Sequence, residues 1–296
     1  QLSKYYGKVR GIEAVDLSVR AGSIFGFIGP NGAGKSTTIR LLLNLIRPDR
    51  GTITVFGEEL GRHDHSYLQR IGYLPSEAIF YPSMTARQVI RYSAELRGQA
   101  AVCEAEANVL IERFDLPSTR RIKDLSLGNR KKVGIICALQ HKAELLLLDE
   151  PTSGLDPLMQ QAFWKLIRER RAEGATIFLS SHTLSEGQQH CDEAAIIREG
   201  RIVSSGKVQE LLADQAKRIT LRGLSADSLQ TLHTIAGDNG IMGLAQEGEA
   251  QLSFLFHGEL PHMVRQLSTL TYQDLTIAEP DLEEIFLHYY EQEGTS

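Results

Sequence analysis

Apolar residues recur along the chain in short runs that are separated by segments of helical periodicity. Between residues 24 and 202 the most apolar runs are 24–28, 145–148, 176–179 and 194–197. They are almost continuously apolar, which is typical of parallel strands that are covered on both faces. Their alternation with helical segments predicts an α/β domain built around a largely parallel sheet.

The strand pattern stops between residues 83 and 139. Segments 85–97 and 102–114 place apolar residues at helical spacing instead, and Thr85 is of a type that caps helix N-termini. A helical insertion within the α/β domain is therefore expected.

A second change of pattern occurs near residue 215. The sequence then predicts a strand at 218–221, a helix at 225–236, a hairpin at 242–257 turning at 247–249, a helix at 260–270, a strand at 272–277 and a last helix at 282–291. This order favours a small α+β unit of the ferredoxin-like βαββαβ kind. We expect two domains, 1–214 and 215–296. The apolar face of the last helix either packs on its own domain or contacts a second subunit or a membrane partner.

Composition excludes several functions. The formal net charge of −5 gives no electrostatic basis for binding nucleic acid. Cys103, Cys137 and Cys191 are scattered singly, which indicates neither a zinc site nor a disulfide framework. No run reaches the roughly 18 to 20 apolar residues of a membrane span, and no signal-peptide pattern is present, so we expect a soluble, cytoplasmic chain. We also expect a few native residues before Gln1, because a motif begins almost at once.

Residues 29–36 have the G-x-x-x-x-G-K-[ST] spacing of a phosphate-binding loop, between an apolar run and the helical segment 37–46. Glycines let backbone N–H groups converge on phosphates, Lys35 is expected to reach the β- and γ-phosphates, and Ser36 is expected to bind Mg²⁺. A chance glycine-rich turn is the alternative, which the flanking strand and helix disfavour. The expected nucleotide contacts are Gly29, Pro30, Asn31, Gly32, Ala33, Gly34, Lys35, Ser36 and Thr37.

Two carboxylates follow the apolar run 145–148, at the strand end where α/β sheets bind ligands. Asp149 is suited to Mg²⁺, and Glu150 faces another direction and can polarise an attacking water as a general base. Alone, such a pair more often caps a helix or forms a surface ion pair. A phosphate-binding loop in the same domain favours catalysis.

Four further segments carry a family resemblance. They are 149–157 (DEPTSGLDP), 180–182 (SSH), 125–129 (LSLGN) and Tyr6 before Gly7. Together with the loop at 29–36 they resemble the ATP-binding subunits of ABC transporters over residues 5–206, and most of all those of bacterial ABC-2 type exporters. The resemblance implies a P-loop NTPase core with an ABC-type helical subdomain at about 77–140, and ATP and Mg²⁺ as cofactors.

The resemblance also implies roles for single residues. Ser126 and Gly128 lie at the signature motif, whose helix N-terminus points at the γ-phosphate held by the other subunit. His182 matches the switch histidine, which contacts the γ-phosphate and orders Glu150, and Tyr6 matches the aromatic residue on which adenine stacks. Asp156 is expected at the dimer interface and can also cap the helix that Pro157 opens.

Three positions depart from the family pattern. Ser76 stands where the family usually has a glutamine that contacts Mg²⁺ and the attacking water, and a serine reaches less far. Leu127 and Asn129 replace glycine and glutamine in the signature motif. These departures put efficient coupling to a membrane partner in question.

The resulting hypothesis is an ATP-hydrolysing subunit that dimerises around two Mg-ATP and drives a separate integral-membrane permease, in the direction of export. The pair would be a homodimer or would include a second ATP-binding subunit, located at the inner face of the cell membrane through the permease. The alternatives are a soluble ABC-type regulatory module without a transport role and an ATP-binding regulator that does not hydrolyse. The chain has one P-loop and no heptad run, which disfavours the first, and it retains Glu150 and His182, which disfavours the second.

Overall fold

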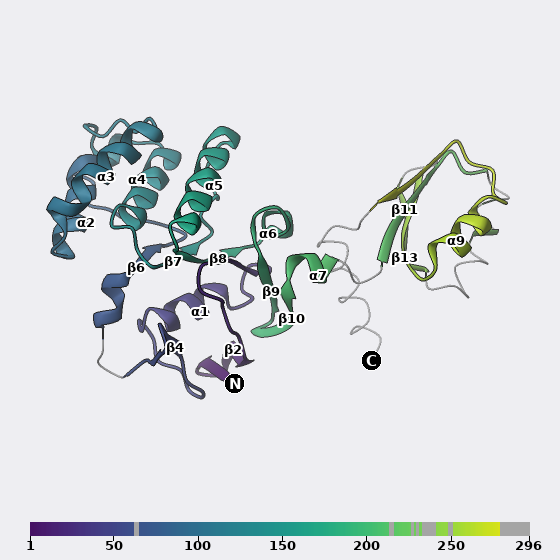
Figure 1. Cartoon of the computed structure of the whole chain (residues 1–296), viewed down its shortest axis with the longest axis horizontal. Coiled ribbons are helices and arrows are strands. Elements are labelled where there is room, and N and C mark those ends of the chain that lie inside the picture. The colour runs from purple at the N-terminus through teal and green to yellow at the C-terminus, as the bar shows by residue number, and fades with distance from the viewer. Residues whose placement is uncertain are drawn as a thin grey trace. The chain divides into compact units, whose positions relative to one another are not determined.

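The chain divides into two compact units, Gln1–Gly206 and Lys207–Ser296 (Figure 1). The computed structural model describes residues 1–61, 65–212, 216–225, 228, 231–232, 241–247 and 251–278. The expected domain boundary between residues 214 and 215 stays a prediction.

A six-stranded sheet forms the centre of the first unit. Its order is β10-β9-β3-β8-β7-β6, with bounds β3 (Ile24–Ile28), β6 (Ile71–Leu74), β7 (Leu145–Asp149), β8 (Thr176–Ser181), β9 (Glu193–Arg198) and β10 (Arg201–Lys207). The pairings from β9 through β3, β8 and β7 to β6 are all parallel. The predicted parallel α/β sheet is therefore confirmed.

Both faces of this sheet are covered, which explains the continuous apolar runs. Leu146 and Leu148 pack in one core cluster with residues of α2 to α5, and Leu147 packs in a second cluster on the other face with residues of α1 and β2. Figure 1 shows the four helices gathered on one side of the strands and α1 on the other. The bounds are α1 (Lys35–Leu42), α2 (Ala86–Leu96), α3 (Ala100–Arg113), α4 (Leu127–Leu139) and α5 (Pro157–Ala172), followed by α6 (Leu184–His190) and α7 (Val208–Leu212).

The helical insertion consists of α2, α3 and α4, and its start is fixed by a capping box. The backbone N–H of Gln88 donates to Thr85 Oγ1 (3.2 Å), and Thr85 N–H donates to Gln88 Oε1 (2.8 Å). At the other end α4 packs closely on β6, because a Cβ on Gly72 would lie 2.2 Å from the carbonyl oxygen of Ala138. Short 3₁₀ turns at Ser66–Arg70 and Ile122–Asp124 precede β6 and α4.

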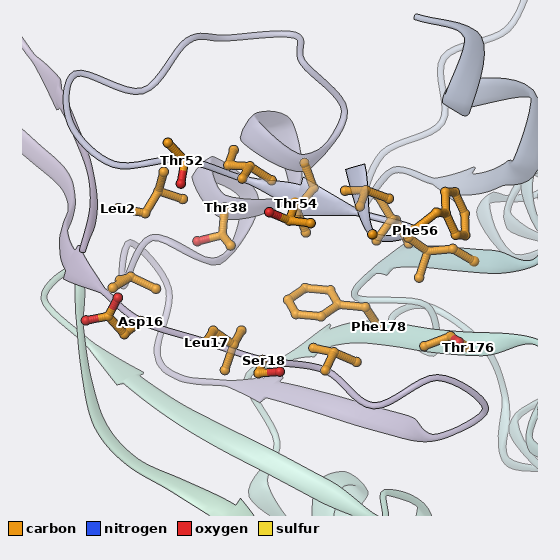
Figure 2. A pocket seen from close by; sticks show the side chains of 18 of the residues that line it. Leu2, Asp16, Leu17, Ser18, Thr38, Thr52, Thr54, Phe56, Thr176 and Phe178 are labelled. Atoms are coloured by element: carbon orange, nitrogen blue, oxygen red, sulfur yellow. The ribbon is translucent and has the colours of Figure 1, made fainter. Parts of the chain in front are cut away.

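Two small antiparallel sheets flank α1: β1 (Leu2–Tyr6) with β2 (Val9–Val15), and β4 (Thr54–Val55) with β5 (Glu58–Glu59). A cavity of about 600 Å³ lies among the segment after β2, the strand β4, α1 and the central sheet. Figure 2 shows Leu17, Thr38, Thr54 and Phe178 around it. None of the residues that the structure places around this cavity belongs to the loop 29–37, so it is separate from the predicted phosphate site.

The second unit contains a four-stranded antiparallel sheet of order β12-β13-β11-β14, with bounds β11 (Ala216–Arg222), β12 (Ile241–Glu247), β13 (Gln251–His257) and β14 (Asp274–Ala278). Helix α9 (Leu260–Leu267) connects β13 to β14. The four strands follow one another along the chain in the predicted order, and α9 lies within the predicted helix 260–270, in agreement with an α+β unit. Most of the expected helix 225–236, residues 248 and 249 of the expected hairpin turn at 247–249, and the last helix 282–291 lie outside the described residues.

Candidate active site

The loop between β3 and α1 has a shape that only glycine permits at several positions. Gly32 and Gly34 have φ of 82° and 108°, in the left-handed region. A Cβ on Gly29 would lie 2.1 Å from the carbonyl oxygen of Ile197, and one on Gly34 would lie 2.6 Å from that of Gly11. The loop is thus held against β9 and β2, and its backbone leads directly into the N-terminus of α1.

Lys35 points back into this loop. Its Nζ donates to the carbonyl oxygens of Gly29 (2.6 Å) and Pro30 (3.2 Å) and lies 3.3 Å from Glu150 Oε1, while the side chain is 5% exposed. A buried ammonium group needs such partners. An anion bound in the loop would meet a cation that is already in place.

Asp149 ends β7 beside the start of α1 and is 3% exposed. Its Oδ2 accepts from Ser36 Oγ (2.8 Å), and its Oδ1 accepts from Ser180 Oγ (2.5 Å) at the end of β8. A hydroxyl and a carboxylate oxygen at this separation fit Mg²⁺, which is held by one or two protein oxygens together with phosphate oxygens and water. The described residues contain no group of three or more His, Cys, Asp or Glu that could hold a metal ion.

Glu150 adopts a left-handed backbone conformation, with φ of 47°. For a residue other than glycine this conformation costs about 1–3 kcal/mol and tends to occur at functional sites. Its N–H donates to Oγ (3.1 Å) and to the carbonyl oxygen (3.2 Å) of Ser180. The carboxylate Oε2 lies 2.7 Å from Nδ1 of His182, whose side chain is half exposed. Glu150 and His182 therefore lie together, at the edge of a cavity of about 270 Å³.

The signature segment lies at an exposed helix end. Ser126 is the N-cap of α4, and its Oγ accepts from the N–H of Asn129 (3.3 Å). Leu127 is 66% exposed and lies near Gly154, which follows β7, because a Cβ on Gly154 would lie 3.6 Å from Leu127 Cδ2. A Cβ on Gly128 would lie 3.4 Å from the carbonyl oxygen of the same Gly154. The structure thus brings Gly128, in the first turn of the helix that Ser126 caps, close to the turn after β7.

Comparisons with known proteins show the family of the chain. The family model described as ABC transporter matches residues 12–153. The linearmycin resistance ATP-binding protein LnrL of Bacillus subtilis is 30% identical, over 97% of this chain and 96% of its own length. The bacitracin transport ATP-binding protein BcrA of Bacillus licheniformis is 37% identical, over 74% of this chain and 76% of its own. The chain belongs to the ABC transporter ATP-binding proteins.

A solved structure of an ATP-binding subunit of an ABC transporter has a TM-score of 0.67 and 33% identity, over 71% of this chain and 89% of that one. The resemblance stated from the motifs is confirmed, and the transporter interpretation is favoured over a regulatory module. As a member of the family, this ABC ATPase binds ATP with Mg²⁺ and hydrolyses it. Family members dimerise and work with membrane permease subunits. None of the helices that the structure describes has the length and apolar composition needed to cross a bilayer.

Tyr6 lies beside the P-loop helix of this ABC ATPase. The ring is 44% exposed, and a Cβ on Gly11 would lie 3.0 Å from Tyr6 Cε2 and 3.1 Å from Thr37 Cγ2. The aromatic ring and the first turn of α1 therefore border the same glycine. This position is compatible with adenine stacking, which stays a prediction.

Asp156 caps α5, since its Oδ1 accepts from the N–H of Met159 (3.0 Å) and Pro157 is the first residue of the helix. The predicted N-cap is confirmed, and the interface role stays a prediction.

Sequence reasoning gave no role to two side chains that hold this ABC ATPase site together. Ser180 bonds both Asp149 and Glu150, and Lys131 donates to the carbonyl oxygen of Glu150 (2.9 Å). The sequence did contain a signal for Ser180, because this residue belongs to the segment 180–182 and lies near the end of a predicted strand, where α/β sheets bind ligands. Its pairing opposite Asp149 requires knowing that β8 is the neighbour of β7.

Proposed function

We propose that this chain forms a dimer, with a second copy or with another ATP-binding subunit, around two Mg-ATP and powers a separate membrane permease that exports its substrate. The observation that carries the proposal is the cluster at the carboxyl ends of β3, β7 and β8. Lys35 lies in direct contact with Glu150 there. Asp149 is bonded to Ser36, the residue after Lys35, and Ser180 bonds both Asp149 and Glu150.

Each residue of the cluster has a role that its chemistry supports. Lys35 binds the β- and γ-phosphates from within the loop, and Ser36 and Asp149 hold Mg²⁺, which neutralises phosphate charge. Glu150 takes a proton from the attacking water. His182 holds the Glu150 carboxylate by donating from Nδ1, and it can donate from Nε2 to the γ-phosphate at the same time only when both ring nitrogens carry a proton.

The exposed N-terminus of α4 supports the dimer. Ser126 is exposed and caps the helix N-terminus, which attracts anions, and Gly128 lies in the first turn of the same helix. In a two-fold dimer this end would bind the γ-phosphate held by the partner, so that each ATP is enclosed by both chains.

An exposed apolar segment supports a permease contact. After Ser76, Ile79 is 90% exposed and Tyr81 is 62% exposed, and Tyr81 packs edge-on against Tyr92 of α2 (6.2 Å between ring centroids). Exposed apolar side chains that gather in one place mark interaction sites. Through this contact the chain would lie on the cytoplasmic side of the membrane without crossing it.

The direction of transport is supported by the names of the relatives. Besides LnrL and BcrA, they include a Nod factor export ATP-binding protein of Ralstonia nicotianae (32% identical, covering 88% of it) and a daunorubicin resistance ATP-binding protein of Streptomyces coeruleorubidus (32%, covering 92% of it). On this basis we propose that the transporter exports its substrate and that the permease selects which substrate is transported.

The test is Glu150→Gln. Loss of the general base should lower turnover by about 10²- to 10⁴-fold, leave ATP binding intact and trap an ATP-bound dimer. The matched control is Glu144→Gln at the start of the same strand, where the side chain is 58% exposed and pairs with Arg70. Phosphate release and size-exclusion chromatography with Mg-ATP measure both outcomes. Parental turnover in Glu150→Gln would refute the assignment.

A further inference from the structure

Lys131 is a buried cation in the second turn of α4, two residues before Val133, which belongs to the apolar core of the first unit. Its side chain is 6% exposed. Burying an ammonium group is costly unless polar partners surround it. Its partners therefore indicate what the residue does.

The ammonium group joins three segments of the first unit. Lys131 Nζ donates to the carbonyl oxygen of Ser76 (3.1 Å), in the segment after β6, and to that of Glu150 (2.9 Å), in the turn after β7. Its own backbone belongs to the helix that Ser126 caps. One side chain thus connects the signature helix, the segment at 76 and the residue assigned as general base.

Glu150 needs such support because its backbone is strained. Its φ of 47° persists only if neighbouring groups hold it, and its N–H is already held by Ser180. The carbonyl oxygen of Glu150 accepts from the N–H of Ser153 (3.3 Å) and, at a shorter distance, from Lys131 Nζ (2.9 Å). Burial lowers the pKa of Lys131, and the charges of Asp149 and Glu150 oppose that shift.

We propose that Lys131 is a positioning residue that fixes the Glu150 backbone relative to the signature helix and to the segment at 76. The inference rests on the proposed function, in which Glu150 is the general base and α4 binds the ATP of the partner. Engagement of α4 by one nucleotide would then be transmitted through Lys131 to the Glu150 that acts on the other nucleotide.

The contact also bears on the departure at position 76. Lys131 bonds the backbone carbonyl of Ser76, so this link is independent of the side chain there. A chain that has lost the usual glutamine thereby keeps a connection between the segment at 76 and the catalytic turn.

The test compares Lys131→Met, which keeps the length and loses the donor, with Lys131→Arg, which keeps donors and charge. We expect kcat for ATP hydrolysis to fall between about tenfold and a hundredfold in Lys131→Met, as small misplacements of catalytic groups do. KM for Mg-ATP should change by less than about threefold, because the P-loop contacts are untouched, and Lys131→Arg should regain most of the loss. Lys132→Met, the next residue on the same helix, is the matched control and should retain the parental kcat.

Glu150→Gln is measured beside these variants. Parental kcat in Lys131→Met together with an inactive Glu150→Gln overturns the inference and leaves the proposed function intact. Parental kcat in both overturns the proposed function. A Lys131→Met variant that loses nucleotide affinity and thermal stability in proportion to kcat, with no recovery in Lys131→Arg, shows a merely structural role and also overturns the inference.

Discussion

Replacing Ser180 with alanine tests how Asp149 is held ready for Mg²⁺. Ser180 is fully buried, and its Oγ donates to Asp149 Oδ1 at 2.5 Å while it accepts from the N–H of Glu150. A hydrogen bond to a charged group contributes about 1.5–3 kcal/mol. The N–H of Glu150 keeps the carbonyl oxygen of Ser180 as an acceptor, so most of the cost falls on Asp149.

We therefore expect Ser180→Ala to lose about 2 kcal/mol of unfolding free energy without nucleotide, or about 4–8 °C in Tm for a unit of this size. The Mg²⁺ concentration for half-maximal ATPase activity should rise by about 10- to 100-fold, as is usual when a group that orients a metal ligand is removed. Thermal unfolding and steady-state hydrolysis at saturating ATP over a Mg²⁺ series measure the two effects.

Ser23→Ala is the matched control. Ser23 is also fully buried, and its Oγ donates to the neutral carbonyl oxygen of Arg20 (2.6 Å). It should lose about 1 kcal/mol and keep the parental Mg²⁺ dependence. If Ser180→Ala needs no more Mg²⁺ than Ser23→Ala does, the reasoning about Asp149 is wrong.

Three further outcomes are expected. Thr85→Ala removes the capping box of α2 and should cost about 1 kcal/mol in urea unfolding with unchanged kcat; a loss of kcat without a loss of stability would contradict this. Tyr6→Ala should weaken ATP binding by about 1–3 kcal/mol and Tyr6→Trp should restore it, as measured by nucleotide titration, whereas equal affinities would exclude stacking. Burial lowers the pKa of His141 and of His190 to about 4, from 6.5 in the unfolded chain. The unfolded state therefore binds more protons between these values, and stability should fall as pH drops from 6.5 to 4, by roughly 1–2 kcal/mol for each histidine in urea melts; a flat profile would show that neither is buried uncharged.

Features that depend on neighbouring residues in the sequence were predicted well. The parallel strands were predicted because both of their faces are buried and their residues are therefore apolar in sequence. Thr85 was predicted as an N-cap, and the structure adds the side chain of Gln88, three residues on, which completes a capping box. The P-loop could be predicted from a local pattern as well, because the glycines that its backbone needs lie within one short segment of the sequence.

Helix ends were predicted less well. The helix expected at 37–46 ends at Leu42, because Asn44 takes a left-handed φ of 53° although the apolar run continues. The helix at the signature motif begins already at Leu127, because Ser126 caps it and offsets the low helix propensity of Gly128 and Asn129.

The parts of the site that the sequence could not predict depend on which elements become neighbours. Ser180 reaches Asp149 because β8 pairs with β7 in register, and Lys131 reaches Glu150 because α4 packs near the turn after that strand. Neither the sheet order nor the left-handed conformation of Glu150 is visible in a local pattern of residues.

The two apolar cores of the first unit and the core of the second share no residue. Those around the six-stranded sheet draw on residues up to Ile202, and that of the second unit draws on residues from Ile219 onward. A substitution in the described core of one unit therefore removes none of the apolar side chains that form the described core of the other unit.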